Sequence, residues 1–217
     1  GLKVALFESH DFASGTSSRA TKLVHGGVRY LAQGHIPLVR EALLERSRLL
    51  ANAPHNAHAL SFVMPSFAWW ERPFYGVGLK VYDALAGRHS LGSTEFLSAR
   101  ETLEALPGVR STGLSGGVRY WDGQFNDARL AIDLARTAQA HGALMLNYCK
   151  VNQIIEDAGK VTGVSVTDVE TGNSYRVAGG CIINATGVWV DQLRDAAKPQ
   201  LVRPSRGVHL VVSQDFM

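Results

Sequence analysis

The order of apolar and polar positions along the chain predicts strands and helices in turn, as in α/β proteins. Residues 2–8 form an apolar run that predicts a short buried strand ending at Glu8. The small and polar residues 9–22 that follow are typical of a loop. Pro37 suits the first turn of a helix that ends near Ala51, because proline lacks the N–H that a first turn leaves unpaired. This helix is expected to turn inward Leu38, Ala42 and Leu49 and to expose Arg40, Glu41, Glu45 and Arg48.

The middle of the chain, residues 56–125, has more aromatic residues and a less regular pattern. Residues 95–108 predict a short helix, and residues 115–125 predict a strand with a turn. This change of character indicates a separate structural region. One helix face within it is predicted by the spacing of Tyr75, Leu79, Tyr82 and Leu85.

The last third of the chain returns to regular patterns. A clean helical pattern covers residues 126–142, where Asn126 or Asp127 is expected to cap the helix. The strands that follow include a hairpin that turns at residues 170–173. They are expected to close on a buried strand at residues 181–187, before a short helix and a new strand near the end of the chain.

Composition narrows the classes of function. The 217 residues are 46% hydrophobic and 19% charged, which is typical of a globular protein with a large core. The net charge of +3 is small and its basic residues form no block, so nucleic-acid binding is not expected. No run of about 18 apolar residues predicts a membrane-spanning helix, and the opening strand gives no sign of a signal peptide. Cys149 and Cys181 are expected to be buried free thiols in a reducing compartment, since neither a disulfide nor a metal site is indicated.

Two strand ends carry features of dinucleotide-binding folds. Glu8 is placed like the carboxylate that binds the adenosine ribose at the end of a strand in such folds. The Gly-x-Gly-x-x-Gly turn that normally precedes it is absent from the chain, which begins where that unit is expected to end. Gly187, after Ala-Thr, either lets a phosphate or flavin approach the backbone or simply makes a strand-to-helix turn; the pattern alone favours neither.

The stretch TKLVHGGVRYL, residues 21–31, carries the densest set of chemical groups. The glycine pair is costly to order, which suggests that something approaches the backbone closely. His25 can act as a base near neutral pH, and Arg29 can grip an anion with its planar fork. The alternative is a structural histidine and a surface arginine, but the density of candidates favours the functional interpretation.

Three stretches together resemble the FAD-dependent glycerol-3-phosphate dehydrogenases of aerobic respiration, which belong to the glycine-oxidase and D-amino-acid-oxidase group of flavoproteins. They are ESHDFASGTSSRATKLVHGGVRYL, NDARL and NATGVW. The resemblance implies part of a Rossmann-like FAD-binding domain in residues 1–55 and 126–200. It also implies an inserted antiparallel substrate domain in residues 56–125 and 201–217.

The resemblance further implies roles for individual residues. His25 would take the proton of the substrate hydroxyl, with His209 as the second candidate for this base. Arg29 and Tyr30 would face the substrate, and Arg29 would bind its anion or polarise the developing carbonyl. FAD would be held by Glu8, Thr16, Ser17, Ser18, Lys22, Leu23, Gly26, Gly27, Val151, Ala185, Thr186, Gly187 and Trp189.

The implied activity is oxidation of sn-glycerol 3-phosphate to dihydroxyacetone phosphate, with electrons passed through FAD to a quinone. The family further implies a peripheral enzyme on the cytoplasmic side of the inner membrane, and a homodimer is compatible with it. The aromatic and basic stretch at residues 69–88 is typical of membrane interfaces, although a helix packed on the core is favoured for it.

Three alternatives remain open. One is an oxidase of the same group that acts on an amino acid or amine, because arginine binds carboxylates as well as phosphates. Another is an oxygen-using glycerophosphate oxidase, which shares the same motif. The third is that this chain by itself is not an enzyme, because it lacks the glycine-rich unit and the substrate ligands of the C-terminal half. The chain alone is then expected to bind FAD weakly or not at all.

Overall fold

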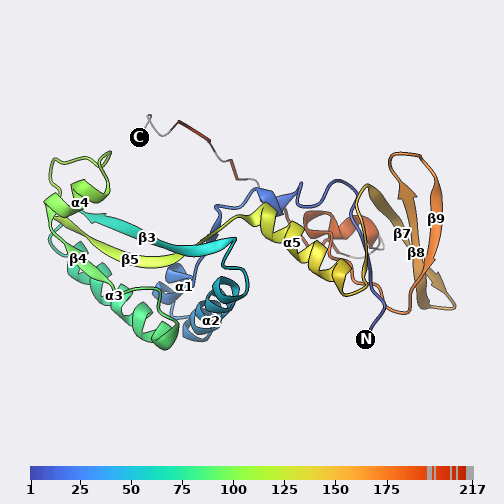
Figure 1. Cartoon of the computed structure of the whole chain (residues 1–217), viewed down its shortest axis with the longest axis horizontal. Helices are drawn as coiled ribbons and strands as arrows, with labels where there is room; N and C mark the ends of the chain where they lie inside the picture. The colour runs from blue at the N-terminus through green and yellow to red at the C-terminus, as the bar shows by residue number, and fades with distance from the viewer. Residues whose placement is uncertain (195–196, 198, 206, 209, 214–217) are drawn as a thin grey trace. The chain divides into compact units, whose positions relative to one another are not determined.

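The computed structural model describes residues 1–194, 197, 199–205, 207–208 and 210–213 (Figure 1). Contacts between residues divide the chain into two compact units. The first unit comprises Gly1–Arg19 and Ala131–Val211, and the second comprises Ala20–Leu130 and Val212–Met217. The mixture of helices and strands confirms the predicted fold class.

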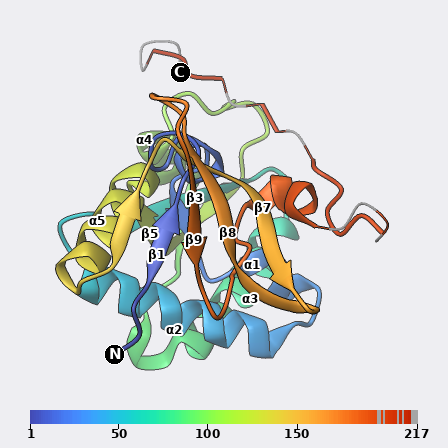
Figure 2. The ribbon, with the colours of Figure 1, turned by 90° about the vertical axis from the view of Figure 1, so that its right-hand side faces the viewer.

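The first unit contains a parallel strand pair and an antiparallel sheet. Strand β1 pairs in parallel with β6, and β8 lies between β7 and β9 in the antiparallel sheet (Figure 2). Val164 and Val166 of β8 are buried, as expected for the central strand. Its elements are β1 (Ala5–Phe7), η1 (Thr16–Ser18), most of α5 (Asp127–Ala140), β6 (Leu144–Leu146), β7 (Cys149–Asp157), β8 (Lys160–Asp168), β9 (Ser174–Ala178) and η3 (Gly187–Leu193).

The second unit is an antiparallel sheet with α1, α2 and α3 on one side, whereas α4 lies on the other (Figure 1). The central strand β5 pairs with β3 along ten residue pairs, and with β2 and β4 on its other edge. The core lies between the helices and this sheet, and its buried members are Val39, Leu43, Tyr82 and Ala86. Its elements are β2 (Leu23–Val24), α1 (Val28–Ala32), α2 (Ile36–Asn52), β3 (Ala57–Ser66), α3 (Glu71–Ala86), η2 (Gly87–His89), β4 (Glu95–Leu97), α4 (Ala99–Ala105) and β5 (Gly116–Phe125).

The predicted helices are present, with two differences: residues 95–97 form strand β4, so that the helix predicted at 95–108 covers only Ala99–Ala105, and α2 buries another face than expected. Pro37 lies in the first turn of α2, as expected. The side-chain oxygen of Asn126 accepts a hydrogen bond from the backbone N–H of Arg129 at 3.0 Å, which confirms the predicted cap of α5. Leu38, however, is exposed, and the buried face of α2 contains Val39, Leu43 and Arg46. The buried face of α2 is therefore shifted by about one residue from the predicted face, and it includes Arg46, whose charge is paired with Asp122.

Two predicted strands are absent from the described part of the chain. Residues 181–187 form no strand, and Ile183 is 84% exposed. The described residues among 201–213 also carry no strand. A strand forms only where a neighbour satisfies its backbone groups, and no described strand pairs with either segment. Cys181 is also exposed rather than buried, and Cys149 is half-buried; both thiols are free.

The two compact units divide the chain differently from the predicted domains at residues 126–130 and 201–211, and above all at residues 20–55. That segment was grouped with the FAD-binding domain, and in the structure it packs with residues 56–130. Compactness does not show which residues bind a cofactor, so the division by function stays a prediction. Among the described residues, no helix has both the length and the apolar content needed to cross a membrane, and no cluster of three or more potential metal ligands occurs.

Candidate functional site

The glycine pair lies between a strand and a helix of the second unit. Strand β2 ends at Val24, which pairs with Gly123 of β5, and α1 begins at Val28. Gly26 and Gly27 between them are buried, whereas His25 and Arg29 are exposed. The structure therefore presents the imidazole and the guanidinium at the surface, on either side of a buried backbone.

The protein itself accounts for both glycines. A Cβ atom at Gly26 would overlap the hydroxyl of Tyr82 and the end of the Leu43 side chain. Gly27 has a φ of +78°, which side chains rarely adopt, and a Cβ there would lie 2.8 Å from the Tyr30 ring. The close approach suggested by the sequence is thus made by neighbouring side chains. A flavin on the other side of this backbone stays a prediction.

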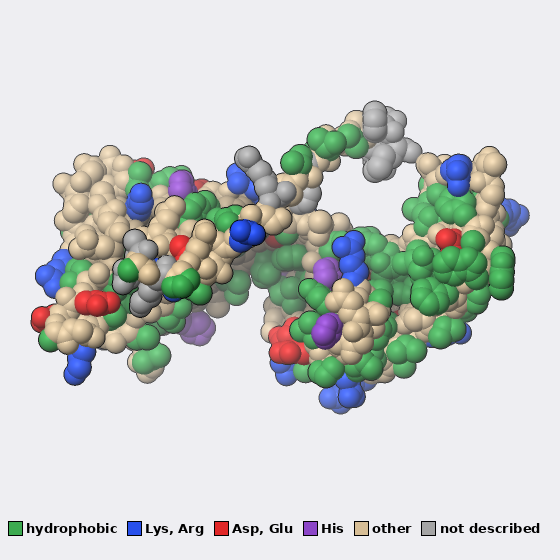
Figure 3. Space-filling view, turned by 180° about the vertical axis from the view of Figure 1, so that it is seen from behind, with side chains coloured by type: hydrophobic (Ala, Val, Ile, Leu, Met, Phe, Trp, Pro, Cys, Tyr) green, Lys and Arg blue, Asp and Glu red, His purple; other side chains and the backbone are tan. Residues whose placement is uncertain are grey.

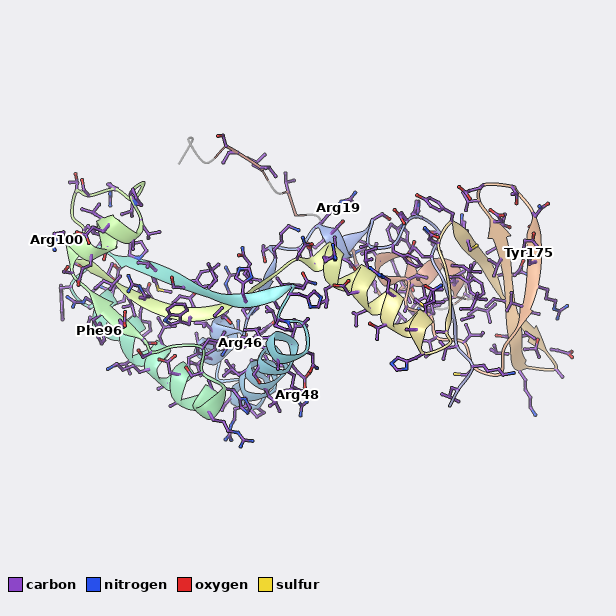
Figure 4. The ribbon with its side chains drawn as sticks, viewed as in Figure 1. Arg19, Arg46, Arg48, Phe96, Arg100 and Tyr175 are labelled. Carbon is purple, nitrogen blue, oxygen red and sulfur yellow. The ribbon has the colours of Figure 1, made fainter. Side chains whose placement is uncertain are left out.

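A buried network of polar side chains lies behind Gly26. The Tyr82 hydroxyl donates to one oxygen of Asp122 at 3.0 Å, and Nη1 of Arg46 donates to the other at 2.9 Å. Arg46, which lies between α2 and the sheet (Figure 4), also donates from Nη2 to the His89 carbonyl at 3.2 Å. Burial, reinforced by the Asp122 charge, strongly raises the pKa of Tyr82, while Arg46 and the backbone amide of Gly26 oppose this rise. Tyr82 therefore stays neutral in the folded protein.

The loop before β2 is fastened to the start of α5. Nζ of Lys22 lies 2.6 Å from Oδ1 of Asp127, and the Ala20 N–H donates to Oδ2 at 3.1 Å. The hydrogen bond from Lys22, followed by those from the backbone N–H groups of Ala128 and Ala20, lowers the pKa of Asp127. Lys22 has a φ of +59°, so this loop adopts a conformation that is unusual for a lysine. Its half-exposed ammonium is engaged with Asp127, and its predicted contact to FAD is untested.

Glu8 follows a strand, as predicted, but that strand covers only Ala5–Phe7 and is not buried, since Leu6 is 42% exposed. Glu8 follows β1 directly, and its backbone N–H donates to the Leu146 carbonyl at 2.8 Å, which continues the parallel pairing. The carboxylate is partly exposed and accepts a hydrogen bond from the His10 backbone at 3.0 Å. It therefore lies at the carboxyl end of a parallel strand, where open α/β sheets bind ligands.

Two further predicted segments of the first unit lie side by side. A Cβ at Gly15, just before the Thr16–Ser18 turn, would be 3.9 Å from the Trp189 ring. The turn at Ala185–Gly187 is held by Asn184, whose side-chain oxygen accepts a hydrogen bond from the Thr186 hydroxyl at 2.7 Å. Gly187 has a φ of +60° and open space around it. The chain thus needs glycine here for its backbone, and the position also leaves room for a ligand.

Of the remaining predicted residues, Val151 lies at a bulge in β7, where the pairing with β8 shifts register between Val151 and Gln153. A bulge leaves backbone groups unpaired, which suits a predicted backbone contact. Leu23 is half-buried in β2, and Tyr30 is partly exposed next to the ring of His35. His209 lies outside the described residues.

The sequence did not predict the partners behind the site. Arg46 occupies a position on the buried face of α2, three residues after Leu43, and Asp122 is a buried residue of β5. A charged residue at a buried position nearly always has a partner of opposite charge. An arginine at the spacing of the buried face of a helix is therefore a signal that a carboxylate such as Asp122 lies opposite it. Asp127 was predicted only as a helix cap, and its contact with Lys22 depends on tertiary structure.

Comparisons with known proteins agree with the motifs. The profile of the family "FAD dependent oxidoreductase" matches residues 1–216. The chain is 43% identical to the mitochondrial glycerol-3-phosphate dehydrogenase of Rattus norvegicus over 98% of its own length and 31% of the rat protein. It is also 43% identical to the glycerol-3-phosphate dehydrogenase of Mycobacterium leprae, over 99% of this chain and 38% of that protein.

Among solved structures, the fold is similar to the glycerol-3-phosphate dehydrogenase of Bacillus halodurans complexed with FAD. The TM-score is 0.64 at 34% identity, over 88% of this chain and 30% of that one. Glycine oxidase from Bacillus cereus shares the fold at a TM-score of 0.59 and 20% identity, over 88% of this chain and 52% of that one. The chain spans about a third of the length of the dehydrogenases it matches.

Proposed function

The chain belongs to the family of FAD-dependent oxidoreductases, and on this premise we propose that the full-length protein oxidises sn-glycerol 3-phosphate to dihydroxyacetone phosphate. The observation that carries the proposal is the exposure of His25 and Arg29 on either side of the buried glycine pair. The identity of 43% to glycerol-3-phosphate dehydrogenases over nearly the whole chain supports the choice of substrate.

The residues of the first unit fit the adenosine and diphosphate parts of FAD by their chemistry. Glu8 offers a partly exposed carboxylate, which can accept hydrogen bonds from ribose hydroxyls. Thr16 and Ser17 are exposed and offer hydroxyls to phosphate oxygens. Gly187 has open space where any other residue would carry a side chain. The proposed FAD ligands of the second unit are Lys22, Leu23, Gly26 and Gly27.

The proposed chemistry divides the hydrogen atoms of the alcohol between the protein and its cofactor. FAD, when bound, accepts the hydrogen on C2 together with the bonding electron pair. His25 takes the proton of the C2 hydroxyl with its exposed imidazole, and His209 is the second candidate for this base. Arg29 binds the phosphate of the substrate or stabilises the carbonyl oxygen as it forms, and Tyr30 lines the substrate space.

The test of this proposal uses the full-length flavoprotein, mixed anaerobically with sn-glycerol 3-phosphate. His25→Asn should retain FAD and slow flavin reduction about 10²- to 10⁴-fold, the usual range for loss of a general base. His141→Asn, at an exposed histidine just after α5, is the control and should behave like the wild type. An unchanged rate in His25→Asn would exclude His25 as the base and direct attention to His209.

We further propose that the electrons pass to a quinone at a membrane surface. In support, the outward face of α3 carries apolar side chains spaced as on one helical stripe. Hydrophobic side chains cover much of the visible face of the second unit (Figure 3). The stripe consists of Trp70, Phe74, Val77 and Val81, and Trp69 precedes it. These five residues are 44–85% exposed. The opposite face of the same helix is packed on the core through Leu79 and Tyr82, as the sequence favoured.

Flotation of the full-length protein with lipid vesicles tests this surface. The vesicles contain anionic lipid, because the basic residues Arg72 and Lys80 flank the stripe. Phe74→Ser should reduce binding to them, because it removes an exposed apolar side chain from the stripe. Leu134→Ser replaces an equally exposed apolar side chain on α5 and should have no effect. Equal binding by Phe74→Ser and the wild type would contradict the role of α3. Peroxide formation in place of quinone reduction would identify an oxygen-using oxidase.

A further inference from the structure

The buried network of Arg46, Asp122 and Tyr82 has no task in the chemistry described so far, yet it contacts the backbone between His25 and Arg29. We propose that these three residues are positioning residues for that segment, with Tyr82 as the member that holds Gly26. This inference rests on the proposed function, because it concerns how that site is kept in its reactive arrangement.

The direction of each hydrogen bond in the network is fixed. Arginine stays protonated, so Arg46 can only donate, and the ionised Asp122 beside it can only accept. The Tyr82 hydroxyl must therefore give its proton to Asp122. The hydroxyl oxygen itself lies against Gly26, since a Cβ built there would overlap it.

The network links α2, α3, β5 and η2 behind the glycine pair. Arg46 comes from α2, Tyr82 from α3 and Asp122 from β5, and Arg46 also reaches the carbonyl of His89 in η2. The Leu43 side chain packs against Gly26 from α2 as well. Gly26 therefore packs against the Leu43 side chain and against a hydroxyl that its hydrogen bond to Asp122 keeps in one orientation.

Packing alone does not explain the choice of residues. A buried ion pair contributes little net stability compared with apolar residues of the same volume, and it is most useful where it fixes a conformation. Arg46 and Asp122 are 1% and 4% exposed at their side chains, so the full cost of removing both charges from water applies. A catalytic group has to be held within about 0.5 Å of its productive geometry, which a directional network achieves and a mobile apolar contact does not.

The test compares Tyr82→Phe with two variants on the same helix, in the full-length flavoprotein. Tyr82→Phe removes only the hydroxyl. Tyr75→Phe removes the same atom from a half-buried tyrosine of α3, and Leu79→Ala destabilises α3 by opening a cavity. For each variant, kcat per bound flavin, KM, the melting temperature and the visible circular dichroism of the bound flavin are measured.

Tyr82→Phe should lower kcat per bound flavin about 10- to 100-fold, as expected for a misplacement of up to about 1 Å, with KM changed less than about threefold. Its flavin dichroism should change as well. Leu79→Ala should lower the melting temperature at least as much as Tyr82→Phe does. Both Leu79→Ala and Tyr75→Phe should keep kcat per bound flavin and the flavin dichroism near the wild-type values. The proposal is overturned if Tyr82→Phe keeps the kcat and flavin dichroism of the wild type, or if Leu79→Ala loses kcat to the same extent.

The dichroism separates this inference from the proposed function. If sn-glycerol 3-phosphate fails to reduce the flavin of the wild-type protein, the proposed function is wrong. A change of flavin dichroism in Tyr82→Phe, and in neither control, would then still support the positioning role, and its absence would refute that role.

Discussion

The structure explains why position 26 is glycine by close packing of neighbouring side chains, and this explanation can be tested without any cofactor. In Gly26→Ala, the new methyl group would overlap the Tyr82 hydroxyl and the Leu43 side chain. Both side chains are only 1% exposed, so neither can turn out into solvent without disturbing the core around it. The Gly26 backbone itself has no positive φ, which leaves the steric overlap as the source of the effect.

The magnitude follows from two contributions. Overpacking of a buried site costs about 1–3 kcal/mol. A shift of Tyr82 would also weaken its 3.0 Å hydrogen bond to the buried Asp122, and such a bond to a charged group contributes about 1.5–3 kcal/mol. Because relaxation relieves part of each, a total of about 2–4 kcal/mol is expected. For a chain of this length that corresponds to a fall in melting temperature of roughly 4–16 °C.

The assay is thermal unfolding of the FAD-free protein, followed by tryptophan fluorescence and circular dichroism. Gly78→Ala is the matched control, since Gly78 lies in α3 with nothing within 4 Å of a Cβ. That variant should be unchanged or more stable by up to about 1 kcal/mol, the helix preference of alanine over glycine. If Gly26→Ala melts with the wild type when FAD is absent and loses only FAD affinity, the glycine serves the cofactor and the packing argument is refuted.

Three further predictions follow from the electrostatics and the composition of the chain. The raised pKa of Tyr82 means that the unfolded chain releases a proton above about pH 10 that the folded protein keeps. The stability present below that pH should therefore decline above it by up to about 1.4 kcal/mol per pH unit, and melting curves between about pH 9 and 11 should show a smaller decline in Tyr82→Phe. The lowered pKa of Asp127 has the opposite sign: its contribution is present above the ordinary value of 3.8 and is lost as the pH falls below it. Asp127→Asn should remove this dependence and speed amide hydrogen exchange at Ala20; equal exchange would show that Asp127 does not hold the loop. The 217-residue chain alone should lose added FAD on dialysis, and retention of stoichiometric flavin would contradict this expectation.

The sequence predicted the parts of the fold that local rules determine. The helix with Pro37 in its first turn and the helix capped by Asn126 depend on periodicity and on capping, which act within a few residues. The buried strand expected at residues 181–187 failed, because a strand also needs a neighbour that local pattern does not reveal. Leu38 was placed on the wrong face for a related reason: Arg46 is buried by a partner 76 residues away.

The sequence indicated the exposed candidate residues of the site, but it did not indicate the buried residues that pack behind them. His25 and Arg29 stand out because their chemistry is visible in the sequence, and the structure leaves both at the surface. The reason for the glycine at position 26 is not visible in the sequence, because Tyr82 and Leu43 reach Gly26 only through tertiary packing. The same holds for Asp127 and its contact with Lys22.

The most direct test of the proposed function is anaerobic mixing of the full-length protein with sn-glycerol 3-phosphate while the visible absorbance of its flavin is followed. The proposal predicts that this substrate bleaches the flavin, that dihydroxyacetone phosphate forms in equal amount, and that glycine, proline and D-amino acids do not. Bleaching by an amino acid, with no response to sn-glycerol 3-phosphate, would contradict it and would assign the protein to another branch of the FAD-dependent oxidoreductases.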